Sequence, residues 1–140
     1  MGTAVPSGIH FPALNSCDPY ISLSKHRPSS GGRDNKWSSS IKPSDEYLIF
    51  KRSFMSRWLD PTGHLWGLQN NLVTIGSNGE RLAKFPRRAN ESDPWHGYPV
   101  SALDQNRRYQ HCPPPALISE WIDRQIVSES QGARIRRGKV

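Results

Sequence analysis

Apolar side chains are distributed unevenly along this chain, and this unevenness limits what it can fold into. Only 34% of the 140 residues are hydrophobic, and the mean hydropathy is −0.71. Over residues 1–43, Ser, Gly, Pro and Asn predominate, and the few apolar residues show no regular period. Such a segment buries too little apolar surface to offset its loss of conformational entropy. We therefore expect an irregular, flexible N-terminal arm over residues 1–43 and one small α+β domain over residues 44–140.

The first regular element is expected in "SDEYLIFKRSFMSRWLD". Ser44 is a suitable N-cap, and acidic residues follow in the first turn, where the helix dipole favours negative charge. Tyr47, Phe50 and Phe54 recur at three- and four-residue spacing, which indicates an amphipathic helix. The turn sequence "DPTG" then ends it. Because the apolar run is short and aromatic, a strand over residues 47–50 is the alternative.

A small antiparallel β-meander is expected between this helix and residue 85. The Asn78-Gly79 pair supplies the positive φ angles of a tight hairpin turn. Across that turn, residues 72–75 are predicted to pair with residues 81–85, and residues 64–68 are the candidate third strand.

The C-terminal segment, residues 115–138, predicts a helical hairpin. Pro114 and Pro115 suit the start of a first helix. The sequence "SESQ", beginning at Ser128, is a capping-box pattern for a second helix, and Gly138 suits its end. Two short helices joined by an apolar turn resemble a helix-turn-helix in outline.

Positive charge favours a polyanionic partner, because the net charge is +7 and the pI is about 9.9. The second hairpin helix is rich in guanidinium groups, which suit contacts to phosphates. The leading functional prediction is therefore a small basic, non-enzymatic module that binds RNA or DNA. Its expected contact residues are Arg87, Arg88, Arg107, Arg108, Arg134, Arg136, Arg137 and Lys139. The alternatives are a solvated basic tail and loop arginines that pair with nearby carboxylates.

The stretch "DPWHGYPV", residues 93–100, supports a second functional hypothesis. Its prolines and glycine specify the backbone tightly and hold His96 near Tyr98, while His111 follows in "QHCPPP". Two histidines, a tyrosine and an arginine can cleave RNA without a metal ion, because one group removes the 2′-hydroxyl proton and another protonates the leaving oxygen. This hypothesis is a toxin-like ribonuclease using His96, His111 and Tyr98. On sequence alone we favour a structural role instead, in which Trp95 and Tyr98 fill the core.

Other classes of function have less support. No ligand pair has the spacing of a zinc site, and no cofactor-binding motif is present, so we expect neither a metal nor a cofactor. A protein-binding adaptor or immunity-type protein is the third hypothesis. The two distant cysteines favour reduced thiols and a cytoplasmic location, and the lack of a long apolar run argues against a membrane partner. The sequence leaves the oligomeric state open.

Overall fold

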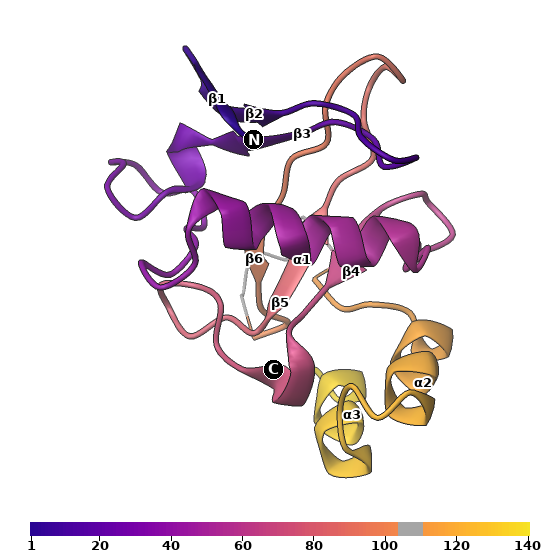
Figure 1. The fold of residues 1–140 in the computed structure, drawn as a ribbon. Helices are drawn as coiled ribbons and strands as arrows, with labels where there is room; N and C mark the ends of the chain where they lie inside the picture. The colour runs from indigo at the N-terminus through magenta and orange to yellow at the C-terminus, as the bar shows by residue number, and fades with distance from the viewer. Residues whose placement is uncertain (104–110) are drawn as a thin grey trace.

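Two small antiparallel sheets and three α-helices make up residues 1–103 and 111–140, the residues that the computed structural model describes (Figure 1). The predicted mixed α+β class is therefore confirmed. The first sheet contains β1 (Thr3–Val5), β2 (Gly8–Phe11) and β3 (Tyr20–Leu23), and the second contains β4 (Leu65–Gly67), β5 (Leu82–Phe85) and β6 (Tyr98–Val100). The helices are α1 (Pro43–Met55), α2 (Pro115–Asp123) and α3 (Glu129–Arg136), with short 3-10 helices η1 (Ser24–His26) and η2 (Asn70–Leu72). None of the helices within the described residues is both long and apolar enough to cross a membrane.

The N-terminal sheet corrects the prediction of an irregular arm over residues 1–43. Its strands are only three or four residues long, too short to show a period in the sequence. Strands β2 and β3 form because their few apolar side chains meet aromatic partners on α1, and the exposed β1 pairs with β2. Phe11 stacks on Tyr47 with ring centroids 4.5 Å apart, and Tyr20 stacks on Phe50 at 4.7 Å. The few apolar residues of this segment are therefore sufficient to form a sheet, because α1 supplies the rest of the core against which they pack.

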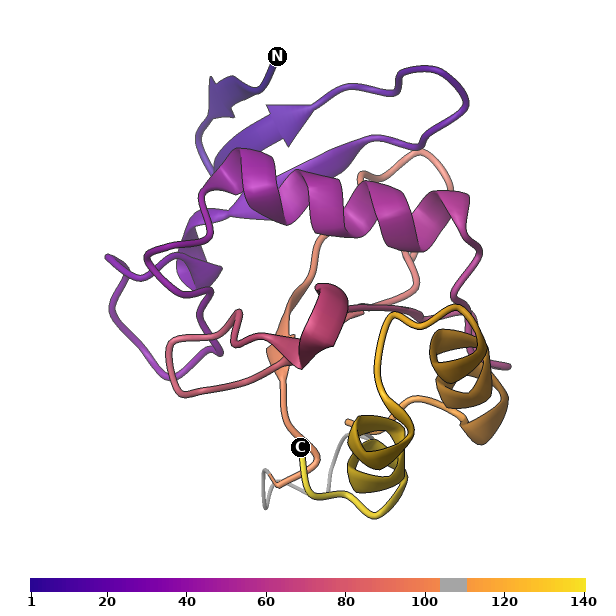
Figure 2. The ribbon, with the colours of Figure 1, turned by 60° about the horizontal axis from the view of Figure 1, so that its bottom comes forward.

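Helix α1 lies between the N-terminal sheet and the second sheet and packs against β3 and β4 (Figures 1 and 2). Its N-cap is Lys42, two residues before the predicted N-cap Ser44, and the Lys42 N–H donates to the Asp45 carboxylate at 2.9 Å. The predicted core residues Tyr47 and Phe50 are buried. Glu46, a residue of the first turn, is buried as well, which the sequence did not indicate.

The second sheet has the expected meander order, but its pairing differs from the prediction. Strand β5 pairs with β4 and β6, and residues 72–75 form no strand. The Asn78-Gly79 turn does form, with Gly79 at φ 85° and the Ile75 N–H donating to the Glu80 carbonyl. Before this turn the chain forms η2, and Gly76 then makes an isolated antiparallel bridge with Trp37. The third strand comes instead from "DPWHGYPV".

Opposite faces of the second sheet belong to two separate apolar clusters. Leu65, Ala83 and Phe85 pack with α1 and the aromatic residues of the first sheet. Trp66, Leu82 and Val100 pack with α2 and α3, which lie together below the sheet in Figure 2. The Ser128–Gln131 capping box forms at the start of α3. The helix-turn-helix-like character of the pair stays a prediction.

Candidate functional site

A cavity of about 610 Å³ opens beside the second sheet, and four of the chain's five histidines line it. They come from four separate segments and are His26, His64, His96 and His111. Further lining residues include the cations Lys25, Arg33 and Lys84, together with Asp34, Asn35 and Tyr98. An unperturbed imidazole has a pKa nearer neutrality than other ordinary side chains, so this cavity gathers side chains of the kind that proteins most often use as acids and bases.

The second sheet positions two of the lining side chains. Lys84 on β5 stands directly opposite Tyr98 on β6 and Trp66 on β4. Residues opposed in this way share a face of the sheet. The Lys84 ammonium lies 5.3 Å from the centroid of the Trp66 ring, which supports its alkyl chain and charge in a nearly buried position.

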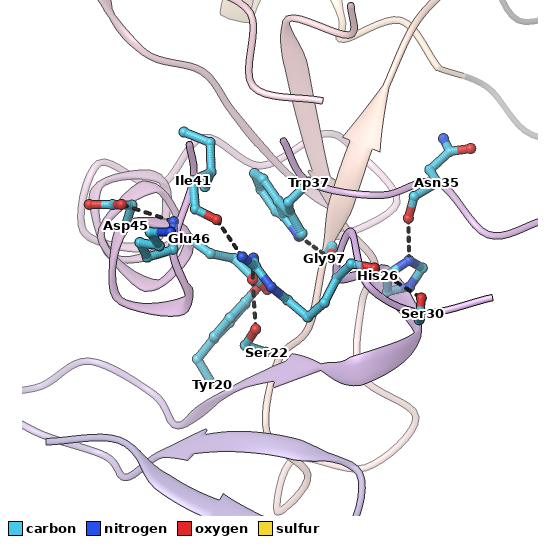
Figure 3. A network of polar contacts seen from close by, with 12 residues as sticks. Tyr20, Ser22, His26, Ser30, Asn35, Trp37, Ile41, Asp45, Glu46 and Gly97 are labelled. Atoms are coloured by element: carbon cyan, nitrogen blue, oxygen red, sulfur yellow. Dashed lines mark hydrogen bonds and ion pairs between the residues drawn. The ribbon is translucent and has the colours of Figure 1, made fainter. Parts of the chain in front are cut away.

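The "DPWHGYPV" stretch is anchored in the core and also lines the cavity. Trp95 is buried in the core, and its indole N–H donates to the Asp18 carboxylate at 3.1 Å. The Gly97 carbonyl accepts the Trp37 indole N–H at 3.3 Å (Figure 3). His96 and Tyr98, the residues between and after these anchors, line the cavity. The structural contacts of the stretch thus fix the backbone that carries two potentially reactive side chains.

His26 is the best-anchored histidine of the cavity. Its Nδ1 lies 2.7 Å from the Asn35 backbone oxygen (Figure 3). A carbonyl oxygen only accepts hydrogen bonds, so Nδ1 carries a proton, and in the neutral ring Nε2 keeps its lone pair. The ring stacks on Tyr98 with centroids 5.1 Å apart, and it lies nearly parallel to the His96 ring at 6.5 Å.

Burial lowers the pKa of three of these histidines. Desolvation of the imidazolium lowers the pKa of His26, and the hydrogen bond to Asn35 opposes that shift. Burial and the Lys25 charge lower the pKa of His96, while burial and the Lys84 charge lower that of His64. Burial also lowers the pKa of Lys84 itself, against the attraction of Asp60. The cavity therefore favours the neutral forms of His26, His64 and His96.

The structure brings the three predicted catalytic residues into the same cavity. His96 and Tyr98 reach it from the stiff loop and β6, and His111 lies buried at its edge. Three contributors were missed by the sequence interpretation: His26, His64 and Lys84. No local pattern marks them as parts of one site, because His26 follows a strand that the sequence did not reveal and Lys84 is a single charge between the apolar residues of β5.

Among the described residues, the predicted nucleic-acid contacts are divided between the loop after β5 and the C-terminal segment around α3. Arg88 is held by the Asp18 carboxylate at 3.0 Å and lies over the Trp95 ring. Arg87 is exposed in the same loop, which extends away from α3 in Figures 1 and 2. Arg134 and Lys139 line a hollow with Glu80, whereas Arg136 donates to Ser119 at 2.6 Å in another hollow. Arg137 is exposed at the end of α3, and Arg107 and Arg108 lie outside the described residues.

No cluster of three or more His, Cys, Asp or Glu side chains suited to a metal ion occurs among residues 1–103 and 111–140. Comparisons with protein-family models, with curated proteins and with solved structures find no match to this chain. The geometry and chemistry of the cavity are therefore the features of this chain that bear on its function.

Proposed function

We propose that the protein cleaves RNA in the four-histidine cavity by metal-independent transphosphorylation. The observation that carries this proposal is the convergence of His96, His111 and His26 with Lys84 and Tyr98 in one concave site. Cleavage next to a 2′-hydroxyl needs a base, an acid and a cation near one phosphate. The lining of the cavity contains all three kinds of group.

The reaction uses two imidazoles in opposite protonation states. A neutral imidazole removes the 2′-hydroxyl proton, the 2′-oxygen forms a bond to phosphorus, and the bond from phosphorus to the 5′-oxygen breaks. An imidazolium gives its proton to the departing 5′-oxygen. The products are a 2′,3′-cyclic phosphate and a 5′-hydroxyl. His96 supplies one of the two imidazoles, and the sequence predicted His111 as the other.

The cations that line the cavity stabilise the negative charge that develops on the oxygens of the phosphoryl group. Lys84 is nearly buried, and Lys25 and Arg33 are exposed at the same cavity. In a partly desolvated site such charges act on the substrate more strongly than they do in water. Entry of a phosphodiester also raises the pKa of the histidines again, which provides the imidazolium that the leaving oxygen requires.

A non-enzymatic nucleic-acid module has less support, because it requires cations gathered on an exposed face. Arg88 is engaged by a carboxylate, and Arg134 and Arg136 line different hollows. Four histidines, Lys84 and Tyr98 instead line a cavity. The balance of these observations favours the enzyme over the binder.

Cleavage of a labelled mixed-sequence oligoribonucleotide in excess EDTA tests the proposal. The wild-type protein is expected to cut it, and His96→Gln is expected to lose about 100-fold or more in rate, the typical value of one acid-base group. His10→Gln is the matched control, because His10 lies in β2 and does not line the cavity. An uncut substrate, an EDTA-sensitive activity or an undiminished His96→Gln rate contradicts the proposal.

A further inference from the structure

His26 and His96 have the mutual geometry of a working pair. Their ring centroids lie 6.5 Å apart and their planes differ by only 7°. Both rings line the cavity, and Tyr98 packs against His26. A phosphodiester that enters this cavity therefore meets two imidazoles from different segments, as a reaction with separate base and acid requires.

Contacts on both its ring and its backbone hold His26 in place. Its Nδ1 donates to the Asn35 carbonyl at 2.7 Å, and its own carbonyl accepts the Trp37 N–H at 2.9 Å. The Asn35 side chain in turn donates to the Pro99 carbonyl at 2.7 Å, which ties this segment to β6 beside Tyr98. The ring orientation and the tautomer of His26 are therefore fixed before substrate arrives, and such preorganisation lowers the cost of reaching the reactive geometry.

The residue after His26 anchors η1 from its other side. The Arg27 guanidinium donates to the buried Glu46 carboxylate at 3.1 Å and to the Ile41 carbonyl at 2.6 Å (Figure 3). Tyr20 and Ser22 donate to the same carboxylate. This network connects β3, η1 and α1, so it stiffens the backbone that carries His26.

From these contacts we infer that His26, and not His111, is the general base that works with His96 as the acid, and that the Asn35 backbone carbonyl is its positioning partner. The inference rests on the proposed function and names the second group of its mechanism. The Nε2 lone pair of His26 takes the 2′-hydroxyl proton, and His96 protonates the 5′-oxygen. The charged and titratable groups that act on His26 are Lys25, Asp34 and His96.

Chemical rescue tests this assignment. His26→Ala is expected to cut RNA about 100-fold more slowly than wild type, and added imidazole is expected to restore part of the rate in proportion to its free-base concentration. His26→Gln keeps most of the side-chain volume and is expected to show no rescue. His10→Ala, outside the cavity, is expected to behave as wild type with or without imidazole.

The outcomes separate the inference from the proposed function. A wild-type protein that does not cut RNA in EDTA overturns both. If wild type cuts RNA, a His26→Ala rate and pH profile equal to wild type overturn the inference alone. A folded His26→Ala protein that is slow but gains nothing from imidazole shows a structural role and also overturns it.

A measurement on the unsubstituted protein covers the case in which His26→Ala does not fold. Two-dimensional ¹H–¹⁵N NMR of the imidazole nitrogens reports the tautomer of each histidine. His26 is expected to carry its proton on Nδ1, and its signals are expected to shift when a dinucleotide with a 2′-deoxy linkage is added. A proton on Nε2 instead, or a His26 ring that does not respond to the dinucleotide, overturns the inference.

Discussion

Replacement of Glu46 by Gln perturbs the buried network behind the cavity without changing its shape. The Glu46 carboxylate is fully buried and accepts hydrogen bonds from Tyr20 at 2.6 Å, Ser22 at 2.7 Å and Arg27 at 3.1 Å. Burial raises its pKa from 4.5 to about 7, although these donors oppose the rise. The glutamine amide of the variant stays neutral at every pH, so the substitution isolates the free energy of ionising this one group.

Proton binding to Glu46 determines whether the free energy of unfolding rises or falls with pH. The folded state holds a proton on Glu46 up to about pH 7, whereas the unfolded chain releases it near 4.5. The folded wild type therefore binds more protons in this window, and its free energy of unfolding falls as the pH rises through it. Integrated between about pH 5 and about pH 8, this contribution falls by about 2.5 kcal/mol.

Other groups cancel when the two proteins are compared. His26, His64 and His96 have lowered pKa values, so they stabilise the fold as the pH rises toward 6.5. They do so in wild type and in Glu46→Gln alike. The cost of leaving Arg27 without its carboxylate is a constant offset, because a guanidinium stays charged throughout this range.

Urea unfolding followed by tryptophan fluorescence at the two pH values measures the effect. The free energy of unfolding of wild type minus that of Glu46→Gln is expected to drop by about 2.5 kcal/mol from about pH 5 to about pH 8. A difference that is the same at both pH values refutes the reasoning, because it means that the hydrogen-bond donors offset burial and leave the pKa of Glu46 no higher than its ordinary value. A free-energy difference that increases with pH also refutes the reasoning, because it means that folding lowers the pKa of Glu46.

Three further predictions follow from the cavity and its supports. The reacting groups His26 and Lys84 are only 4% and 6% exposed, so single-stranded RNA is expected to be cut at least tenfold faster than the same sequence in a duplex, measured by gel analysis at equal concentrations; equal rates contradict this. Lys84→Met keeps the contact with Trp66 but removes the charge, and is expected to lower kcat by about 100-fold with little change in KM. Gly97→Ala places a methyl group against the Phe85 ring. The free energy of unfolding, measured by thermal unfolding, is expected to fall by about 1–3 kcal/mol.

The sequence predicted best those elements whose signals are local. Helix α3 begins with a capping box that four consecutive residues specify, and α1 shows a recurrent aromatic face within its own length. In each case the side chains that determine the element lie within a few residues of one another, so a pattern in the sequence is sufficient.

Elements that depend on distant partners were missed. Strands β2 and β3 are buried through contacts of Phe11 and Tyr20 with Tyr47 and Phe50, which lie far along the chain in α1. Glu46 looks like an ordinary first-turn acid, and only Tyr20, Ser22 and Arg27 explain its burial. The same limit applies to the cavity, because His26 and His96 are brought together by the pairing of segments and not by their spacing.

Analysis of the RNA ends produced in excess EDTA tests the proposed chemistry most directly. A ³¹P NMR spectrum of the products from a short oligoribonucleotide is expected to show a 2′,3′-cyclic phosphate, and a single 2′-deoxy substitution is expected to protect the linkage that follows it. Products that carry 5′-phosphates, or cleavage at the 2′-deoxy linkage, mean that the 2′-oxygen is not the nucleophile and contradict the mechanism assigned to the four-histidine cavity.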